Sequence, residues 1–325
     1  MKHTEFVAFH VAYHYDAVMK SLLAALTIST LSVLPATAAN ATESTGSLNI
    51  VAMGDSYGSG TGAGNYEPGT EAGCFRSANS YSSVIVDELR RRGKQVNFTN
   101  VTCSGSAIRT LRESFKGEPP QFDALKRNTN VVMLSIGTGD IDFAGFGGLC
   151  IQADCSGAPA TAIRGLLPAM GERLTALLID IKTRSPRAKI VLTAYGQQVT
   201  PGENAEGVTL DPICDSQVFS AQERVEGNQV ARELDATLRN ATKAAKARGV
   251  NARFVSPYVN SVDLRPEFED HSLCQAEPPF YRGFDALAPG QEGIDAVLHL
   301  NQQGQAAMAD LIQRKLPALA GPAAL

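Results

Sequence analysis

The chain has 325 residues, 29 of them Lys or Arg and 33 Asp or Glu, with a formal net charge of -4. A balance this mild, without a basic stripe, argues against nucleic acid as a partner. It does not restrict the substrate.

Residues 1–38 are expected to be a leader that is removed. The apolar run Ser21–Leu34 follows Lys20 and precedes the small residues Ala36–Ala38, which is the order of a secretory signal with an A-x-A cleavage site. Met19 fits better as the true start, because the residues before it match no part of such a signal. No run reaches the roughly 20 apolar residues that a membrane helix needs. We therefore expect a secreted, extracellular protein without stable membrane insertion.

The remaining roughly 285 residues are enough for one extended domain. No Pro/Ser-rich linker, repeat or low-complexity tract divides them. We expect a single domain over residues 45–325, acting as a monomer.

Short β-rich runs alternate with longer amphipathic stretches. The predicted strands are Leu48–Met53, Gln95–Thr102, Asn130–Ile136, Lys189–Ala194 and Ala252–Val255, all read as buried. The predicted helices are Ser80–Arg92, Thr161–Thr183, Ala221–Ala247 and Gln302–Leu316. This alternation predicts an α/β fold with three layers, in which helices cover both faces of a mainly parallel five-stranded sheet.

Three loops after predicted strands are rich in Gly, Ser and Asp: Gly54–Gly58, Cys103–Ser106 and Gly137–Asp140. In open parallel sheets, the working groups collect at the carboxyl ends of the strands. We expect the functional site where these loops meet.

A serine hydroxyl becomes a good nucleophile only when a base takes its proton. After the leader is removed, His271 and His299 are the histidines that remain. His299 lies just before the last predicted helix, where a loop can aim it toward Ser56, the serine of the loop Gly54–Gly58. His271, flanked by Asp270, is expected to be a surface or loop-fixing residue.

These residues resemble the SGNH (GDSL-type) hydrolases, and in particular the secreted actinobacterial lipases and esterases with three disulfides. The four sequence blocks of that family match, in order, Gly54-Asp55-Ser56, Gly105, Gly137–Asp140 and His299–Gly304. The resemblance implies the flavodoxin-like fold of that superfamily, with Ser56 as nucleophile and His299 as base. Ser56 also fits G-x-S-x-G, the nucleophile elbow of α/β-hydrolases, but that elbow normally follows several strands rather than the first.

The group that orients the histidine is left open between two candidates. The family pattern D-x-x-H would place an aspartate at position 296, which is Ala296, and Asp295 is one residue too early. The backbone carbonyl of Ala296 is the alternative, and either group could fix the imidazole tautomer.

The resemblance assigns the oxyanion hole to the backbone N–H groups of Ser56 and Gly105 and to an asparagine side chain, but Gly139 stands at the asparagine position. Loss of one such donor costs on the order of 10²–10³ in turnover, so a slow enzyme is expected. The hydroxyl of Thr138 or a backbone N–H of Gly137–Gly139 could replace the donor. On this basis Gly139→Asn is expected to raise kcat.

Six cysteines in a chain bound for an oxidising compartment indicate disulfides, and the resemblance implies the pairs Cys74–Cys103, Cys150–Cys155 and Cys214–Cys274. We expect no metal site, because no C-x2-C pair is present. Residues Gly58–Ala63 mimic a dinucleotide-binding fingerprint without the helix that should follow, so no cofactor is expected.

The function that these features imply is hydrolysis of a carboxylic ester, with a lipid or acyl ester as substrate and an acyl-enzyme on Ser56. Deacetylation of a polysaccharide, or acyl transfer to an alcohol, remains open on the same fold. So does a degenerate hydrolase that binds an envelope lipid or glycan without turning it over.

Overall fold

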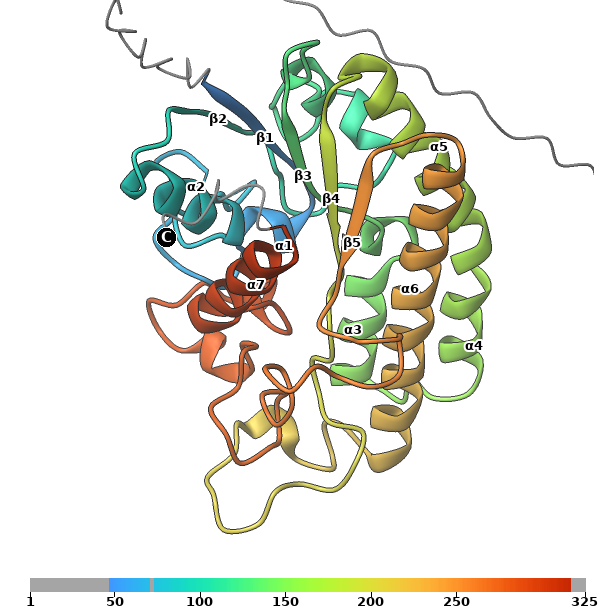
Figure 1. The fold of residues 1–325 in the computed structure, drawn as a ribbon. Coiled ribbons are helices and arrows are strands. Elements are labelled where there is room, and N and C mark those ends of the chain that lie inside the picture. The colour runs from blue at the N-terminus through green and yellow to red at the C-terminus, as the bar shows by residue number, and fades with distance from the viewer. Residues whose placement is uncertain (1–46, 71–72, 317–325) are drawn as a thin grey trace, which may run out of the picture. The chain divides into compact units, whose positions relative to one another are not determined.

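The computed structural model describes residues 47–70 and 73–316, so the predicted leader lies outside the described residues. Five parallel strands form one sheet in the order β2-β1-β3-β4-β5 (Figure 1). The strands are β1 (Leu48–Gly54), β2 (Val96–Asn100), β3 (Val131–Ser135), β4 (Lys189–Thr193) and β5 (Ala252–Val255). The predicted parallel five-stranded sheet is confirmed.

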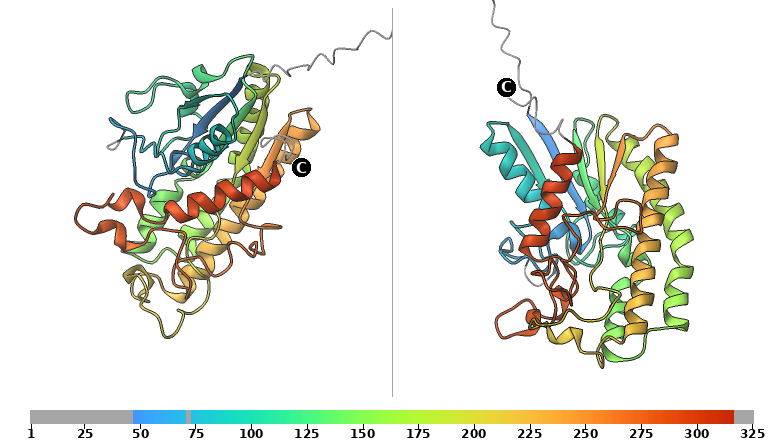
Figure 2. Two further views of the ribbon diagram at one scale, coloured as in Figure 1. Left: turned by 60° about the vertical axis from the view of Figure 1, so that its left-hand side comes forward. Right: turned by 60° about the horizontal axis from the view of Figure 1, so that its bottom comes forward.

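Helices cover both faces of this sheet, which gives the predicted three layers (Figure 2). The α-helices are α1 (Ser56–Ser59), α2 (Tyr81–Arg91), α3 (Phe143–Gln152), α4 (Ala158–Gly165), α5 (Leu167–Arg184), α6 (Ala221–Ala247) and α7 (Gln302–Lys315). Helices α2 and α7 pack together on one side, and α4, α5 and α6 pack together on the other. The 3-10 turns are η1 (Thr110–Arg112), η2 (Gln121–Ala124), η3 (Thr138–Asp140), η4 (Pro212–Cys214), η5 (Phe284–Leu287) and η6 (Ile294–Ala296).

The central strand β3 shows why its sequence is apolar throughout. Val132 and Leu134 enter the larger core, which α5 and α6 also fill, whereas Val131 and Met133 enter the core beneath α2 and α7. Successive side chains of a strand point to opposite faces, so a strand that is covered on both faces needs apolar residues at every position.

Two predicted elements differ from the structure. Strand β2 is half exposed, with side chains that alternate between partly buried and exposed, because it is an edge strand and pairs with β1 alone.

The helix predicted over Thr161–Thr183 is two helices that break at Leu166, where Pro168 lies in the first turn of α5. Proline lacks the N–H that a continuous helix requires.

Helix α3 was not predicted from the sequence. It contains Gly145, Gly147 and Gly148, and glycine is about 1 kcal/mol less favourable than alanine in a helix interior. Its N-terminal turn packs against η3 and its C-terminal half is tied by a disulfide at Cys150. Tertiary contacts therefore stabilise a helix that local propensity does not favour.

Candidate active site

Ser56 is the first residue of α1, directly after β1. Gly54 ends β1 with φ +123°, and a Cβ added there would lie 1.9 Å from the carbonyl oxygen of Ser135, so this turn requires glycine. Asp55 caps α1 by accepting the N–H of Tyr57 at 3.2 Å. The turn places Ser56, with 8% of its surface exposed, at the carboxyl end of β1, where the sequence predicted the site.

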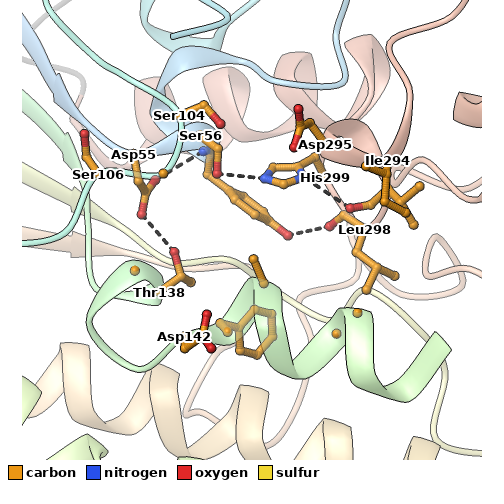
Figure 3. A pocket seen from close by; sticks show the side chains of 18 of the residues that line it. Asp55, Ser56, Ser104, Ser106, Thr138, Asp142, Ile294, Asp295, Leu298 and His299 are labelled. Carbon is orange, nitrogen blue, oxygen red and sulfur yellow. Dashed lines mark hydrogen bonds between the residues drawn. The ribbon is translucent and has the colours of Figure 1, made fainter. Parts of the chain in front are cut away.

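His299 reaches Ser56 from the loop between η6 and α7. Its Nε2 lies 2.7 Å from Ser56 Oγ (Figure 3). Asn301 holds the end of this loop by accepting the N–H of Gly304 at 2.9 Å, which caps α7. On the other side, Leu298 adopts a left-handed φ of 64°, a conformation that turns the chain sharply before the histidine.

The carbonyl oxygen of Val297 lies 3.2 Å from His299 Nδ1. The predicted carbonyl of Ala296 is therefore wrong by one residue: it accepts the backbone N–H of His299 at 3.1 Å, because Ala296 ends the tight turn η6. Asp295, the other candidate, lines the cavity, but no hydrogen bond joins it to the imidazole in the described structure. A carbonyl can only accept, so in the neutral ring Nδ1 carries the hydrogen and Nε2 faces Ser56 with its lone pair.

Burial lowers the pKa of His299 from 6.5 to about 4. The hydrogen bond to Val297 and the charge of Asp295 act in the opposite direction, with smaller effect. The imidazole is therefore neutral at pH 7, the state in which it can accept a proton from Ser56.

Asp55 directly precedes Ser56 and is almost completely buried. Its carboxylate accepts three side-chain hydroxyls, from Ser135 at 2.7 Å, Thr138 at 3.1 Å and Tyr195 at 2.5 Å. Burial raises the pKa of Asp55 to about 6, against the opposing effect of these hydrogen bonds. Asp55 thus joins the ends of β1, β3 and β4 below the site rather than facing the reacting groups (Figure 3).

The backbone N–H groups expected to stabilise an oxyanion lie around the same cavity. Ser56, Gly105 and Gly139 all line it, and in the described residues none of their N–H groups has a backbone acceptor. Such free N–H groups are the donors that an oxyanion hole requires.

The absence of an asparagine at position 139 has a steric cause. A Cβ added to Gly139 would lie 2.6 Å from the carbonyl oxygen of Ser106, so the turn after β3 packs against the loop after β2 only if residue 139 is glycine. We therefore expect Gly139→Asn to lower kcat, whereas the sequence alone predicted that it would raise kcat. The hydroxyl of Thr138 does not replace the amide either, because it donates to Asp55.

The cavity beside Ser56 and His299 has a volume of about 410 Å³, within the range of small-molecule sites. Helix α3 provides an apolar wall through Phe143, Ala144 and Ile151. Lys116 lines the opposite part, with its Nζ 3.0 Å from the carbonyl oxygen of Gly73. The α3 wall was not predicted from the sequence, because the three glycines of this helix interrupt its apolar pattern.

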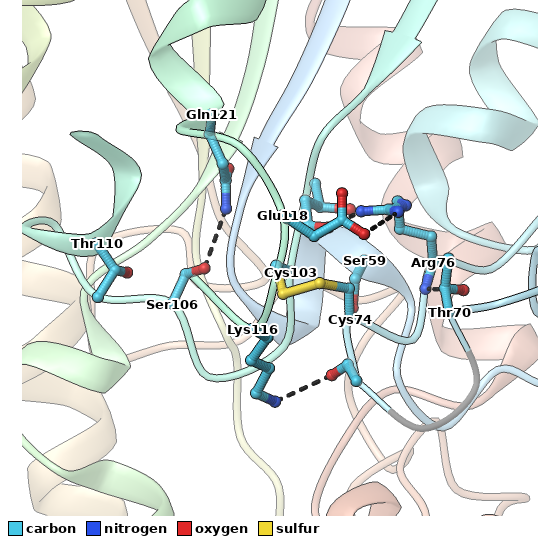
Figure 4. Close-up of a disulfide and its surroundings, with 12 residues drawn as sticks. Ser59, Thr70, Cys74, Arg76, Cys103, Ser106, Thr110, Lys116, Glu118 and Gln121 are labelled. Carbon is cyan, nitrogen blue, oxygen red and sulfur yellow. Dashed lines mark hydrogen bonds and ion pairs between the residues drawn. A yellow bond between two sulfur atoms is a disulfide. The ribbon is translucent and has the colours of Figure 1, made fainter. Parts of the chain in front are cut away.

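The three predicted disulfides, Cys74–Cys103, Cys150–Cys155 and Cys214–Cys274, are confirmed. Figure 4 shows the first of them beside the loop that carries Gly105. Sequence reasoning missed Gln121, which connects this loop with the end of β1: its Nε2 donates to Ser106 Oγ and to the Gly54 carbonyl, both at 3.0 Å.

His271 lies outside this constellation. Its ring stacks on Phe280 with centroids 3.9 Å apart, and its Nδ1 lies 2.8 Å from the carbonyl oxygen of Pro278. These contacts fit the loop-fixing role that the sequence indicated.

Among residues 47–70 and 73–316, no helix is both long enough and apolar enough to span a bilayer. The same ranges contain no group of three or more His, Cys, Asp or Glu side chains that could hold a metal ion.

The chain is similar to several lipases of Streptomyces. Lipase 2 of Streptomyces coelicolor is 28% identical over 312 residues, which cover 90% of this chain and 94% of the relative. A lipase of Streptomyces rimosus is 27% identical over 234 residues, which cover 71% of this chain and 75% of the relative.

Solved structures show the same fold. The crystal structure of the extracellular lipase of Streptomyces rimosus aligns with a TM-score of 0.65 at 22% identity, over 82% of this chain and 99% of that one. The crystal structure of phospholipase A1 from Streptomyces albidoflavus NA297 aligns with a TM-score of 0.63 at 21% identity, over 83% of this chain and 99% of that one. Residues 52–307 match the GDSL-like lipase/acylhydrolase family, and this chain belongs to that family.

Proposed function

We propose that the protein is a secreted carboxylic ester hydrolase in which Ser56 is the nucleophile and His299 the general base. The observation that carries the proposal is the 2.7 Å contact between Ser56 Oγ and His299 Nε2, with the second ring nitrogen facing a carbonyl. A nucleophile paired with an oriented base is the arrangement that acyl transfer by serine requires.

In the first half-reaction, Ser56 Oγ attacks the acyl carbon while its proton moves to His299 Nε2. The carbonyl of Val297 stabilises the imidazolium that forms, taking the place of a triad carboxylate. The N–H groups of Ser56, Gly105 and Gly139 would donate to the developing oxyanion. Collapse of the tetrahedral intermediate breaks the bond to the alcohol, which takes the proton from His299, and leaves the acyl group on Ser56.

In the second half-reaction, a water molecule loses its proton to His299 Nε2 and attacks the acyl carbon. The second tetrahedral intermediate expels Ser56 Oγ, which regains the proton, and the carboxylic acid leaves. An alcohol in place of this water would give acyl transfer through the same groups.

The cavity favours an apolar acyl group over a sugar. Its α3 wall presents Phe143, Ala144 and Ile151, and removal of each apolar CH₂ from water contributes about 0.8 kcal/mol to binding. We therefore infer a lipid or other aliphatic acyl ester as the substrate.

Secretion is part of the proposal. It is supported by the charged, apolar and A-x-A order of residues 20–38, by the three disulfides, and by similarity to an extracellular lipase.

Lys116 favours a phospholipid as a second candidate substrate. Its Nζ lies 3.7 Å from the place where a Cβ on Gly105 would be, so the ammonium stands beside the proposed oxyanion hole. Three carboxylates, Asp55, Asp142 and Asp295, also line the cavity, so the ammonium of Lys116 is the group that would attract an anionic part of a substrate. Lys116→Gln should lower the ratio of phospholipid to neutral aryl ester hydrolysis by about fivefold, the size of an exposed ion pair of about 1 kcal/mol.

The main test uses the mature protein with short-chain aryl esters and a serine-directed fluorophosphonate probe. Ser56→Ala and His299→Ala should each lower kcat by on the order of 10⁴-fold or more, because members of such a unit act together. Peptide mapping should find the probe on Ser56.

His271→Ala is the matched control, since it removes a histidine that contacts Phe280 instead of Ser56. Equal losses in His271→Ala and His299→Ala would contradict the assignment of the base. A protein that binds lipid, reacts with no probe and cleaves no ester would be a degenerate hydrolase, and the proposal would fail.

A further inference from the structure

A second, smaller cavity of about 50 Å³ lies behind the apolar wall of the first. The two cavities share three lining residues, Phe143, Gly147 and Leu298. The second cavity continues between α3 and the N-terminal part of α6, where Phe146 and Phe219 line it. The shared residues thus form a partition between the catalytic cavity and this space.

The surface of the second cavity is suited to an aliphatic chain, because the amide NH₂ groups of its two uncharged polar residues already donate to other parts of the protein. Asn228 Nδ2 donates to the carbonyl oxygens of Val199 and Arg224, both at 2.8 Å. Gln198 Nε2 donates to the hydroxyl of Tyr57 at 2.9 Å. Apart from two charged residues, the remaining lining is apolar, and burial of a polar ligand group without a hydrogen bond would be costly there.

The charged residues of this wall are engaged in the same way. Glu223 accepts the N–H and the hydroxyl of Ser220 at 2.9 and 2.8 Å. Arg224 Nη2 donates to the carbonyl oxygen of Cys214 at 2.6 Å. Neither side chain is left to hold an anion, so a carboxylate or phosphate has no reason to occupy this space.

Within this partition, Gly147 and Leu298 lie close together. A Cβ added to Gly147 would lie 3.3 Å from Leu298 Cδ1, so the leucine side chain occupies the space that the glycine leaves. The backbone of Leu298 is held on both sides: its N–H donates to the Arg282 carbonyl at 2.8 Å and its carbonyl accepts the hydroxyl of Tyr57 at 2.6 Å. The backbone of Leu298 is therefore fixed, and its side chain is the part that can move.

We propose that the second cavity is the distal end of the acyl-binding site, and that the contact between Gly147 and Leu298 sets the length of chain that the enzyme accepts. This inference rests on the proposed function, since the acyl group must start at Ser56. A short acyl chain ends against Leu298 in the first cavity. A longer linear chain displaces the leucine side chain and enters the space lined by Phe146 and Phe219.

The kinetic test compares two opposite changes over p-nitrophenyl esters from C4 to C16. Leu298→Ala joins the cavities and should raise kcat/KM for long relative to short chains by about fourfold for each additional methylene group accommodated. Gly147→Ala drives a methyl group against Leu298 and should lower the same ratio.

Gly165→Ala is the comparator, because it adds the same methyl group at the end of α4, where a Cβ meets no atom within 4 Å and the residue lines neither cavity. It should leave the long-to-short ratio at the wild-type value. The ratio also separates a change in specificity from damage to Ser56 and His299, because such damage would lower kcat/KM for esters of every chain length by the same factor.

A binding measurement makes the test independent of turnover. In the Ser56→Ala background, calorimetric titration with hexadecanoate and hexanoate should show tighter hexadecanoate binding for Leu298→Ala and weaker binding for Gly147→Ala, with hexanoate affected little by either. Identical hexadecanoate affinities in all three proteins, or an unchanged length profile in both variants, would overturn the inference. Absence of ester cleavage and of Ser56 labelling would instead overturn the proposed function and leave the binding result to decide the role of the second cavity.

Discussion

The hydroxyl of Tyr57 donates to the carbonyl oxygen of Leu298 at 2.6 Å, so the residue after Ser56 holds the residue before His299. The two lie 241 positions apart in the chain. Tyr57→Phe removes this bond but keeps the ring that packs on His299. We expect kcat to fall about fivefold with little change in KM, because a loss of about 1 kcal/mol in a positioning bond loosens the approach of His299 to Ser56.

Steady-state kinetics and fluorophosphonate labelling rates measure this effect. Tyr258→Phe, which removes a buried hydroxyl that has no hydrogen-bond partner in the described structure, is a suitable control. A Tyr57→Phe protein with wild-type kcat would show that the loop holds His299 without this bond.

Gly139→Asn should lower both stability and kcat. Its Cβ would meet the backbone carbonyl of Ser106 at 2.6 Å, and overpacking against backbone costs about 1–3 kcal/mol. Gly165→Ala, where a Cβ meets no atom within 4 Å, should keep the melting temperature. A folded Gly139→Asn protein with raised kcat would mean that the turn yields and that the amide serves as an oxyanion donor.

Asp55→Asn should destabilise the protein by about 1–3 kcal/mol at pH 8, because one carboxylate oxygen that accepts hydroxyls becomes an NH₂ donor facing other donors. The raised pKa of about 6 also gives a pH dependence. The folded state holds this proton more tightly than the unfolded chain, so its contribution to stability is complete below pH 3.8 and is lost as the pH rises through 6. Urea unfolding of both proteins from pH 3.5 to 8 measures this effect. The part of the stability loss that comes from Asp55 should be present in the wild type and absent in Asp55→Asn.

The kcat/KM profile should fall on the acid side with a pKa near 4 rather than 6.5. His299 must be neutral to accept the proton, and burial lowers its pKa to about 4. Activity should therefore persist through pH 5 and disappear as the pH drops through 4. The limb near 4 should remain in Asp55→Asn; a wild-type limb near 6 that vanishes in that variant would assign the titration to Asp55.

The disulfides should contribute unequally to stability. Closure of a longer loop restrains the unfolded chain more, which gives about 4 kcal/mol for the Cys214–Cys274 bridge and about 2 kcal/mol for the short Cys150–Cys155 bridge. Paired Cys→Ala variants unfolded in urea measure both. A larger loss for the Cys150–Cys155 pair would show that this bridge chiefly holds the end of α3 in the folded state.

Local pattern alone predicted the sheet, most of the helices and the place of the site. Apolar runs of strand length and helical periodicity reflect burial within one element, so their positions are readable along the chain. The turn after β1 placed Ser56 in the expected site, and the small number of histidines left after the leader favoured His299, but the role of Ser56 as nucleophile came from the family resemblance. The three cysteine pairs came from resemblance rather than from spacing.

The tertiary structure alone decided which groups complete the site. Val297 rather than Ala296 faces the imidazole because η6 ends one residue before the carbonyl that turns inward. Gly139 takes its identity from the approach of Ser106, and Gln121 acts by reaching Gly54 across 67 positions. Helix α3 forms despite its glycines because packing stabilises it. Each of these depends on distances between segments far apart in the chain, and no local pattern carries that information.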